Sequence, residues 1–176
     1  MDFARALELV GGHLDGEGVR WAVCGGLGLA AYGQVRTTFD ADLVADGDAA
    51  DRVIAFMERT GFETLYRSRG FSNHLHPDPG LGRVDFVWVH GTTREKLFDA
   101  ARTLAGPGGR PIRAPRPEHL AAMKVAAMAS DPARTFQDLA DIRFLIDLPG
   151  IDREEIRGYF ARHGLEARFD ELEASR

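Results

Sequence analysis

A carboxylate interrupts the most apolar stretch of this chain. The segment RVDFVWV, residues 83–89, has the nearly continuous apolar character of a strand buried on both faces, broken by Asp85. Burying a carboxylate is costly unless a metal ion, a basic partner or a functional demand accounts for it. The chain must therefore fold so that Asp85 meets a compensating partner, which limits the folds that are open to it.

Two more carboxylates lie on an earlier predicted strand, residues 40–44. Because side chains alternate along a strand, Asp40 and Asp42 point to the same face, with Cα atoms roughly 7 Å apart. Asp85 adds a third carboxylate if the two strands are neighbours. Three carboxylates on one face repel each other unless divalent cations lie between them, and oxygen ligands favour magnesium or manganese. This pattern suits phosphoryl or nucleotidyl transfer, although an isolated Asp-x-Asp more often marks a turn before a solvated edge strand.

Strands alternate with helices along the first hundred residues. Apolar residues at three- and four-residue spacing predict an amphipathic helix from Phe3 to the glycines after Val10 or to Gly16. The further expected elements are strands at 21–24, 40–44, 62–66, 71–75 and 83–89, and helices at 27–32, 49–60 and 93–104.

The segment GPGGRPIRAPRP is rich in proline and glycine and predicts a domain boundary. Helices are expected after it at 118–129, 135–148 and 152–163. The predicted fold class is therefore α+β: a mixed sheet flanked by helices in residues 1–108, followed by a C-terminal helical bundle in residues 109–176.

Composition narrows the class of protein further. A chain of 176 residues, 44% hydrophobic and 28% charged, fits one ordinary soluble domain with a small helical subdomain, and no stretch approaches a membrane span of roughly 18 apolar residues. The start of the chain lacks the pattern of a signal peptide, and one cysteine cannot form an internal disulfide, so a cytoplasmic location is expected. The net charge of −5 offers no general attraction to nucleic acid.

Gly25 and Gly26 follow a predicted strand and precede a short helix, so backbone N–H groups are available there to bind phosphate. Together with the residues after them, they give the sequence a likeness to a known family. The stretch AVCGGLGLAAYGQVRTTFDADLV resembles the nucleotidyltransferase fold, which is polymerase-beta-like, in the AbiEii/AbiGii toxin-like family. The family pattern, Gly-Gly, a short helix and then Arg-x-Thr-x-Asp-x-Asp, is matched by Gly25, Gly26, Arg36, Thr38, Asp40 and Asp42.

The likeness continues to about residue 147. VDFVWV supplies the later carboxylate, and HLAAMKVAAM followed by RTFQDLADIRFL resembles the helical signature of the family, with Lys124, Arg134, Asp138 and Asp141. The sequence departs from the family in having Gly26 in place of a serine found in the wider superfamily, Gln137 in place of a basic residue, and Ala41 in place of a larger aliphatic one.

The resemblance implies a role for each matched residue. Asp40 and Asp42 would bind Mg²⁺ or Mn²⁺, and Asp85 would complete that metal site or act as the base. Lys124 would be a catalytic cation near the phosphates, and Asp141 would hold the helices together. The implied nucleotide-binding residues are Gly25, Gly26, Arg36, Thr38, Lys124 and Asp138.

The implied activity is transfer of a nucleoside monophosphate from a nucleoside triphosphate such as ATP to an acceptor, which could be RNA, a protein or a small molecule. A toxin that is restrained by an antitoxin protein is the particular version that the family suggests. Modification of a small-molecule antibiotic is the alternative among enzymes. A nucleotide-binding or interaction module that has lost turnover is the alternative outside enzymes.

Other candidates have a structural interpretation beside the functional one. His74 and His76 are spaced like a strand-borne metal pair, but the following Pro77–Gly82 stretch favours an exposed turn. Cys24 is expected to pack in the core. Lys124 could also extend to the surface. The basic run of Arg110, Arg113 and Arg116 fits a solvated linker as well as a phosphate or RNA contact.

Overall fold

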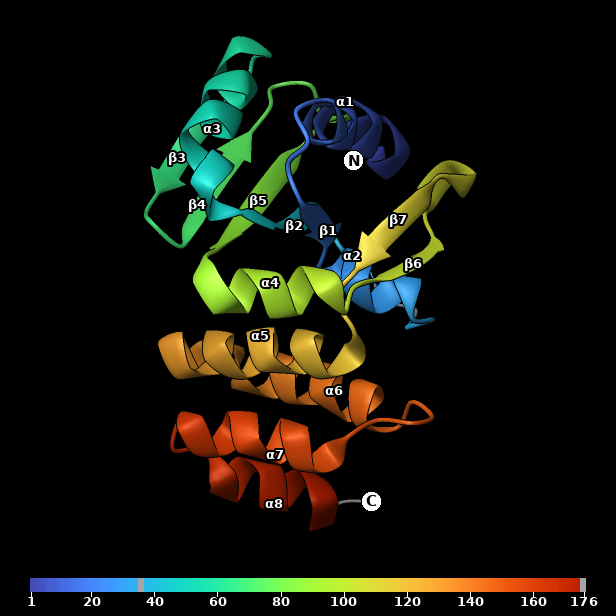
Figure 1. The fold of residues 1–176 in the computed structure, drawn as a ribbon, viewed down its shortest axis with the longest axis vertical. Coiled ribbons are helices and arrows are strands. Elements are labelled where there is room, and N and C mark those ends of the chain that lie inside the picture. Colours follow the sequence, from blue (N-terminus) through green and yellow to red (C-terminus); the bar gives the residue numbers. More distant parts are fainter. Residues whose placement is uncertain (35–36, 175–176) are drawn as a thin grey trace. The chain divides into compact units, whose positions relative to one another are not determined.

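The computed structural model describes residues 1–34 and 37–174 and divides the chain into two compact units, Met1–Pro115 and Arg116–Arg176 (Figure 1). Within the described residues, no helix is both long and apolar enough to cross a bilayer. In chain order, the first unit contains α1 (Phe3–Gly16), β1 (Trp21–Val23), α2 (Gly25–Ala31), β2 (Asp40–Asp46), α3 (Ala50–Arg59), β3 (Glu63–Arg67), β4 (Phe71–Leu75), β5 (Arg83–Val89), α4 (Gly91–Asp99), β6 (Arg102–Ala105) and β7 (Pro111–Ala114).

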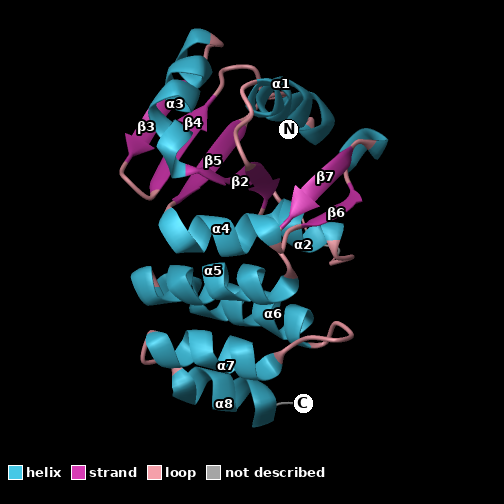
Figure 2. Ribbon diagram, viewed as in Figure 1, coloured by secondary structure: helices cyan, strands magenta, loops and turns pink. Residues whose placement is uncertain are grey.

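Five strands of the first unit form one mixed sheet in the order β1-β2-β5-β4-β3 (Figure 2, with β1 labelled in Figure 1). β2 and β5 are parallel, whereas the other neighbouring pairs are antiparallel. The α+β class with a mixed sheet is thus confirmed. In the parallel pair, Asp42 lies directly opposite Asp85 and Asp40 directly opposite Arg83. The two central strands therefore carry their polar residues side by side.

The hydrophobic core occupies one face of this sheet. Ala41 and Leu43 of β2 and Phe86 and Trp88 of β5 are buried there against α1 and α3, which lie over the same face in Figure 1. Because strand side chains alternate, the residues between them, including Asp42 and Asp85, must face the other side. The packing of the core thereby fixes the face on which the carboxylates appear.

The proline- and glycine-rich segment forms a β-hairpin, β6–β7, within the first unit. Ile112 and Ala114 of β7 alternate into the core, and this burial makes the segment part of the first unit despite its prolines. Gly108 and Gly109 form the tip with φ values of 67° and 78°, a conformation that favours glycine. This hairpin was not predicted, because two four-residue strands give little periodic signal.

The second unit is all-helical. It contains α5 (Pro117–Ser130), α6 (Thr135–Ile146), α7 (Arg153–Arg162) and α8 (Glu166–Ala174). The first three helices correspond to the predicted ones, whereas α8 was not predicted. Phe169 of α8 is buried and packs against Phe160 of α7, with ring centroids 5.4 Å apart. One such aromatic contact anchors a short helix whose other residues are mostly exposed and polar.

A chain of hydrogen bonds runs through the core side of β4. His74, which is fully buried, has Nε2 2.9 Å from Ser72 Oγ and Nδ1 3.1 Å from Thr64 Oγ1. Trp88 Nε1 donates to Ser72 Oγ, and the Thr64 hydroxyl donates to Glu58. These two donors fix the direction of the other hydrogen bonds: Ser72 donates to His74 Nε2, and His74 Nδ1–H donates to Thr64. His74 is therefore a neutral core residue, and the expectation of an exposed turn was wrong for it.

The burial of His74 makes the stability of the fold depend on pH. Burial lowers the pKa of His74 from 6.5 to about 4, against a weaker opposing attraction from Glu58. The unfolded chain takes up a proton near pH 6.5, whereas the folded chain does so only near pH 4. The stability that His74 contributes is thus complete above pH 6.5 and is lost as the pH falls toward 4.

We expect the free energy of unfolding of the wild type to fall between pH 7 and pH 5 more steeply than that of His74→Gln. The difference in slope should approach, but not exceed, about 1.4 kcal/mol per pH unit. Urea unfolding at several pH values measures it. His163→Gln, which replaces an exposed histidine, is the control and should keep the wild-type slope. Equal slopes for all three proteins would contradict the assignment of His74 as the neutral group.

Candidate active site

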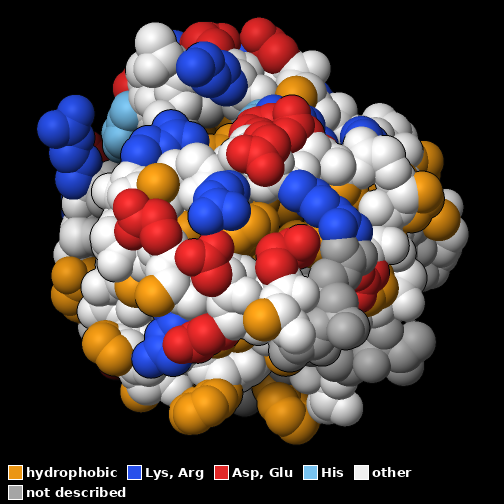
Figure 3. All heavy atoms as spheres, turned by 90° about the horizontal axis from the view of Figure 1, so that it is seen from below, with side chains coloured by type: hydrophobic (Ala, Val, Ile, Leu, Met, Phe, Trp, Pro, Cys, Tyr) orange, Lys and Arg blue, Asp and Glu red, His pale blue; other side chains and the backbone are white. Residues whose placement is uncertain are grey.

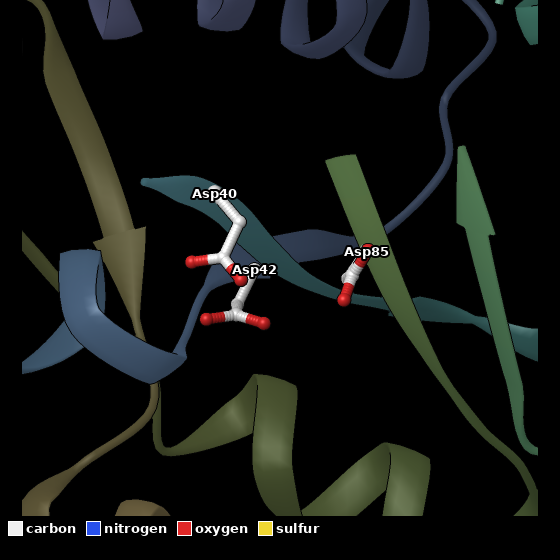
Figure 4. Close-up of side chains that lie close together, drawn as sticks. All are labelled: Asp40, Asp42 and Asp85. Carbon is white, nitrogen blue, oxygen red and sulfur yellow. The ribbon is translucent and has the colours of Figure 1, made fainter. Parts of the chain in front are cut away.

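Three carboxylates meet on the face of the sheet opposite the main core. Asp40 and Asp42 project from β2 and Asp85 from β5 (Figure 4). One ligand oxygen of each lies within 4.8 Å of the others. Asp85 is buried, at 6% exposure, whereas Asp40 and Asp42 are half-buried. The parallel register of β2 and β5 produces this convergence, because it places Asp42 and Asp85 side by side on one face.

The segment between β1 and β2 shapes the surroundings of Asp40 and Asp42. The Thr38 hydroxyl donates a hydrogen bond of 2.9 Å to Asp40 Oδ1, which orients that carboxylate. Gly25 has φ of +50°, and a Cβ atom there would lie 1.8 Å from Asp42 Oδ2. A Cβ atom on Gly26 would lie 2.7 Å from the Thr38 side chain. Both glycines are thus required by the close approach of Asp42 and Thr38.

Arg83 is a member of this site that the motif comparison did not select. Its guanidinium forms a two-pronged ion pair with Asp85, with Nε 2.8 Å from Oδ1 and Nη2 3.0 Å from Oδ2. This hydrogen bonding raises the pKa of Arg83 above its usual value, and the nearby charges of Asp40 and Asp42 add to the effect. Alternation could have revealed Arg83, since it lies two residues before Asp85 and so on the same face.

Asn73 is a second residue that sequence reasoning missed. It lies on β4 directly opposite Asp85 and therefore shares the face of the carboxylates. Its Oδ1 atom is buried and has no hydrogen-bond partner among the described residues. Nothing in the sequence signals this neighbour, because the pairing of β4 with β5 is set by the tertiary fold.

The three carboxylates fit a divalent cation. They offer hard oxygen donors whose atoms are close enough to share an ion, and the sum of their charges with Arg83 is −2. Mg²⁺ and Mn²⁺ prefer such ligands. The donor set contains no thiolate or imidazole within the described residues of the cluster, so its chemistry is that of an oxygen-ligated ion.

Lys124 lies in a buried cluster of the second unit. Its Nζ is 2.9 Å from Asp138 Oδ1 on α6 and 2.7 Å from Asp141 Oδ2 on the same helix. Lys124, Asp138 and Asp141 are 7%, 0% and 2% exposed, so Lys124 does not extend to the surface, which was the alternative to its functional role. Arg134 adds an ion pair to Asp138 at 3.2 Å. Within this unit the cluster joins α5 to α6.

The remaining candidates have local partners or lie outside the described residues. Arg36 lies outside the described residues. Arg110 pairs with Asp15 at 2.8 Å, and Arg113 donates to the carbonyl oxygen of Phe98. His76 accepts a hydrogen bond from the Asp78 backbone N–H at the turn, and Cys24 is buried.

Comparison with known proteins shows the fold. No family model and no curated protein matches the sequence. The solution structure of the antibiotic-resistance factor ANT(2'')-Ia is similar, with a TM-score of 0.67 and 18% identity over 99% of this chain and 98% of that one. A lincomycin-bound lincosamide antibiotic adenylyltransferase, LnuA, has a TM-score of 0.54 and 19% identity over 81% of this chain and 96% of that one.

A nucleotidyltransferase-like protein from Paracoccidioides brasiliensis is also similar, with a TM-score of 0.55 and 16% identity over 94% of this chain and 91% of that one. At such identities these likenesses establish the nucleotidyltransferase fold and nothing narrower. Membership of the AbiEii-like branch stays a prediction.

Replacing Gly25 by alanine should disturb Asp42 directly. We expect Gly25→Ala to lose divalent-cation binding in calorimetry, because the added Cβ displaces the Asp42 carboxylate. Gly18→Ala is a matched control, since Gly18 also has positive φ, +63°, but has open space around its Cβ position. Both variants should lose about 1–2 kcal/mol of stability from backbone strain. Only Gly25→Ala should also lose cation binding. Equal cation binding by the two variants would show that Gly25 is needed for the turn alone.

Lys124→Ala should destabilise the second unit, because it removes the ammonium group that pairs with two buried carboxylates and leaves Asp138 with Arg134. Breaking a buried ion pair costs about 3–5 kcal/mol. Adding Asp141→Asn to the same chain should restore part of the loss, since it removes one uncompensated charge. Urea unfolding measures both variants. A Lys124→Ala protein as stable as the wild type would contradict the buried cluster.

Proposed function

We propose that this chain is a metal-dependent nucleotidyltransferase that moves a nucleoside monophosphate from a nucleoside triphosphate to a hydroxyl group of an acceptor. The observation that carries the proposal is the convergence of Asp40, Asp42 and Asp85 on one face of two parallel strands. The fold shared with nucleotidyltransferases supports it.

In this proposal Asp40 and Asp42 hold the cation, and Thr38 keeps Asp40 in the orientation that it needs. A bound Mg²⁺ or Mn²⁺ supplies charge that polarises the phosphoryl oxygens and favours ionisation of the attacking hydroxyl. The bond from the α-phosphorus to the bridging oxygen breaks, a bond from the acceptor oxygen to the α-phosphorus forms, and pyrophosphate leaves. Asp85 is then a third ligand or the base that accepts the hydroxyl proton.

The backbone of Gly25 and Gly26 lies against Asp42 and Thr38, and we propose that it provides the N–H donors for the phosphates. Arg36, Lys124 and Asp138 keep the roles that the motif resemblance implies, as predictions. For Lys124 and Asp138, any such role has to be compatible with their ion pair, so turnover of a Lys124 variant is informative only when that variant is folded.

A small molecule is the acceptor that the structural likenesses favour. ANT(2'')-Ia, similar along nearly the whole of this chain, is named as an antibiotic-resistance factor, and another structure of it holds adenylyl-2''-tobramycin. LnuA is named as a lincosamide antibiotic adenylyltransferase.

Transfer to RNA or protein, as by a toxin under the control of an antitoxin, is the alternative raised by the sequence motifs. On the face shown in Figure 3, acidic and basic side chains are interspersed, and the chain carries 22 basic against 27 acidic residues. A polyanionic acceptor would therefore have to be held by local contacts rather than by the general field of the molecule.

Incubation with labelled triphosphates and Mg²⁺ tests the proposal. Aminoglycosides, lincosamides, total RNA and a protein extract serve as acceptors in separate reactions. We expect label on a small-molecule acceptor. Label on RNA or protein instead would support the toxin-type role. Triphosphate binding in calorimetry without transfer to any acceptor would support a non-catalytic module.

Asp42→Asn should abolish both transfer and metal-dependent triphosphate binding while the fold stays intact, because it removes a ligand and relieves repulsion between carboxylates. Calorimetry with Mg²⁺ and triphosphate, together with circular dichroism, measures the two effects. Asp51→Asn removes the same charge from an exposed position and should bind as the wild type does. Wild-type binding by Asp42→Asn would make Asp42 an ordinary surface residue.

A further inference from the structure

The ion pair between Arg83 and Asp85 occupies a carboxylate that the proposed reaction needs. Both oxygens of Asp85 accept hydrogen bonds from the guanidinium, at 2.8 and 3.0 Å. Arg83 also lies opposite Asp40 in the β2–β5 register and on the same face. One cation of the chain itself is thus placed within the cluster of three carboxylates.

A guanidinium and a divalent cation compete for such a carboxylate. Each carboxylate oxygen retains a lone pair when Arg83 is bound, but a divalent ion at that oxygen would face a fixed positive charge at short range. Repulsion between like charges a few ångströms apart weakens the binding of the ion. Arg83 therefore neutralises part of the cluster and at the same time opposes the ion that would neutralise it.

The two sides of the ion pair differ in exposure. The Asp85 side chain is 8% exposed and fixed on a central strand, whereas the Arg83 side chain is 42% exposed. A half-exposed guanidinium can turn into water or toward an anionic ligand, but leaving the buried Asp85 unpaired is costly unless another cation takes its place. Arg83 is thus the partner whose side chain can move away from the ion pair.

We propose that Arg83 is a built-in counterion for the metal site: it holds Asp85 until a divalent cation is bound and must release Asp85 before that carboxylate can act as a ligand or a base. In this arrangement Asp40 and Asp42 receive the first ion. The inference rests on the proposed function, because it assigns a role to the same metal site.

Calorimetric titration with Mn²⁺ alone, without nucleotide, tests this role. We expect Arg83→Gln to bind Mn²⁺ about tenfold more tightly than the wild type, in the range that a charge-assisted hydrogen-bonded pair contributes. Arg83→Lys keeps the charge but cannot form the two-pronged contact, so its affinity should lie between those of the wild type and Arg83→Gln.

Arg67→Gln is the matched control, since it removes one positive charge from an exposed ion pair with Asp51. It should leave the Mn²⁺ affinity of the wild type unchanged. Tightening of the same size by Arg67→Gln would overturn the inference, because the effect would then come from net charge.

A double-mutant cycle locates the effect at Asp85. In the Asp85→Asn background, Arg83→Gln should change Mn²⁺ affinity less than twofold, because the carboxylate that Arg83 holds is gone. Thermal unfolding followed by circular dichroism, with and without Mn²⁺, verifies that each variant is folded. If Arg83→Gln folds only with Mn²⁺, the Mn²⁺ affinity of Arg83→Lys is compared with that of the wild type instead. Equal Mn²⁺ affinities of these two proteins would overturn the inference.

The results also separate this inference from the proposed function. Arg83→Gln could bind Mn²⁺ with the affinity of the wild type or more weakly, in a way that still requires Asp42. That result would support the metal site and overturn the counterion role. No Mn²⁺ binding by the wild type or by any Arg83 variant would overturn both.

Discussion

Repulsion among Asp40, Asp42 and Asp85 is the constraint on which the rest of the first unit depends. Three carboxylates whose oxygens lie within 4.8 Å of each other repel, and this repulsion opposes folding. Hydrogen bonds from neighbouring side chains reduce this repulsion. Thr38 donates to Asp40, and Arg83 engages both oxygens of Asp85.

The same two strands also build the hydrophobic core. Leu43 and Phe86 face α1 and α3, while the neighbouring Asp42 and Asp85 face away. A slip of one residue by either strand would turn that strand over: β2 would bury Asp42 and expose Leu43, or β5 would bury Asp85 and expose Phe86. The apolar packing on one face thus fixes the register that assembles the charged cluster on the other.

Each unit places a basic side chain against two or three carboxylates, but the two arrangements differ in how easily they can change. Lys124 is buried with Asp138 and Asp141, so breaking its contacts separates buried charges where water cannot take their place. Arg83 is half-exposed and can turn into water when another cation takes its place at the buried Asp85. The buried cluster suits a permanent connection between helices, whereas the exposed one suits a site that must accept a ligand.

The sequence by itself determined the α+β class, the strands that carry the carboxylates and the face that Asp40 and Asp42 share, because alternation and apolar runs are local properties of the chain. It placed His74 at a turn, it left the burial of Lys124 open between a functional role and the surface, and it gave no sign of Asn73 beside Asp85. Those positions were decided by the tertiary structure, through the pairing of β4 with β5 and the packing of α5 on α6. The burial and the partner of a polar side chain depend on segments far away in sequence, and no local pattern records which segments those will be.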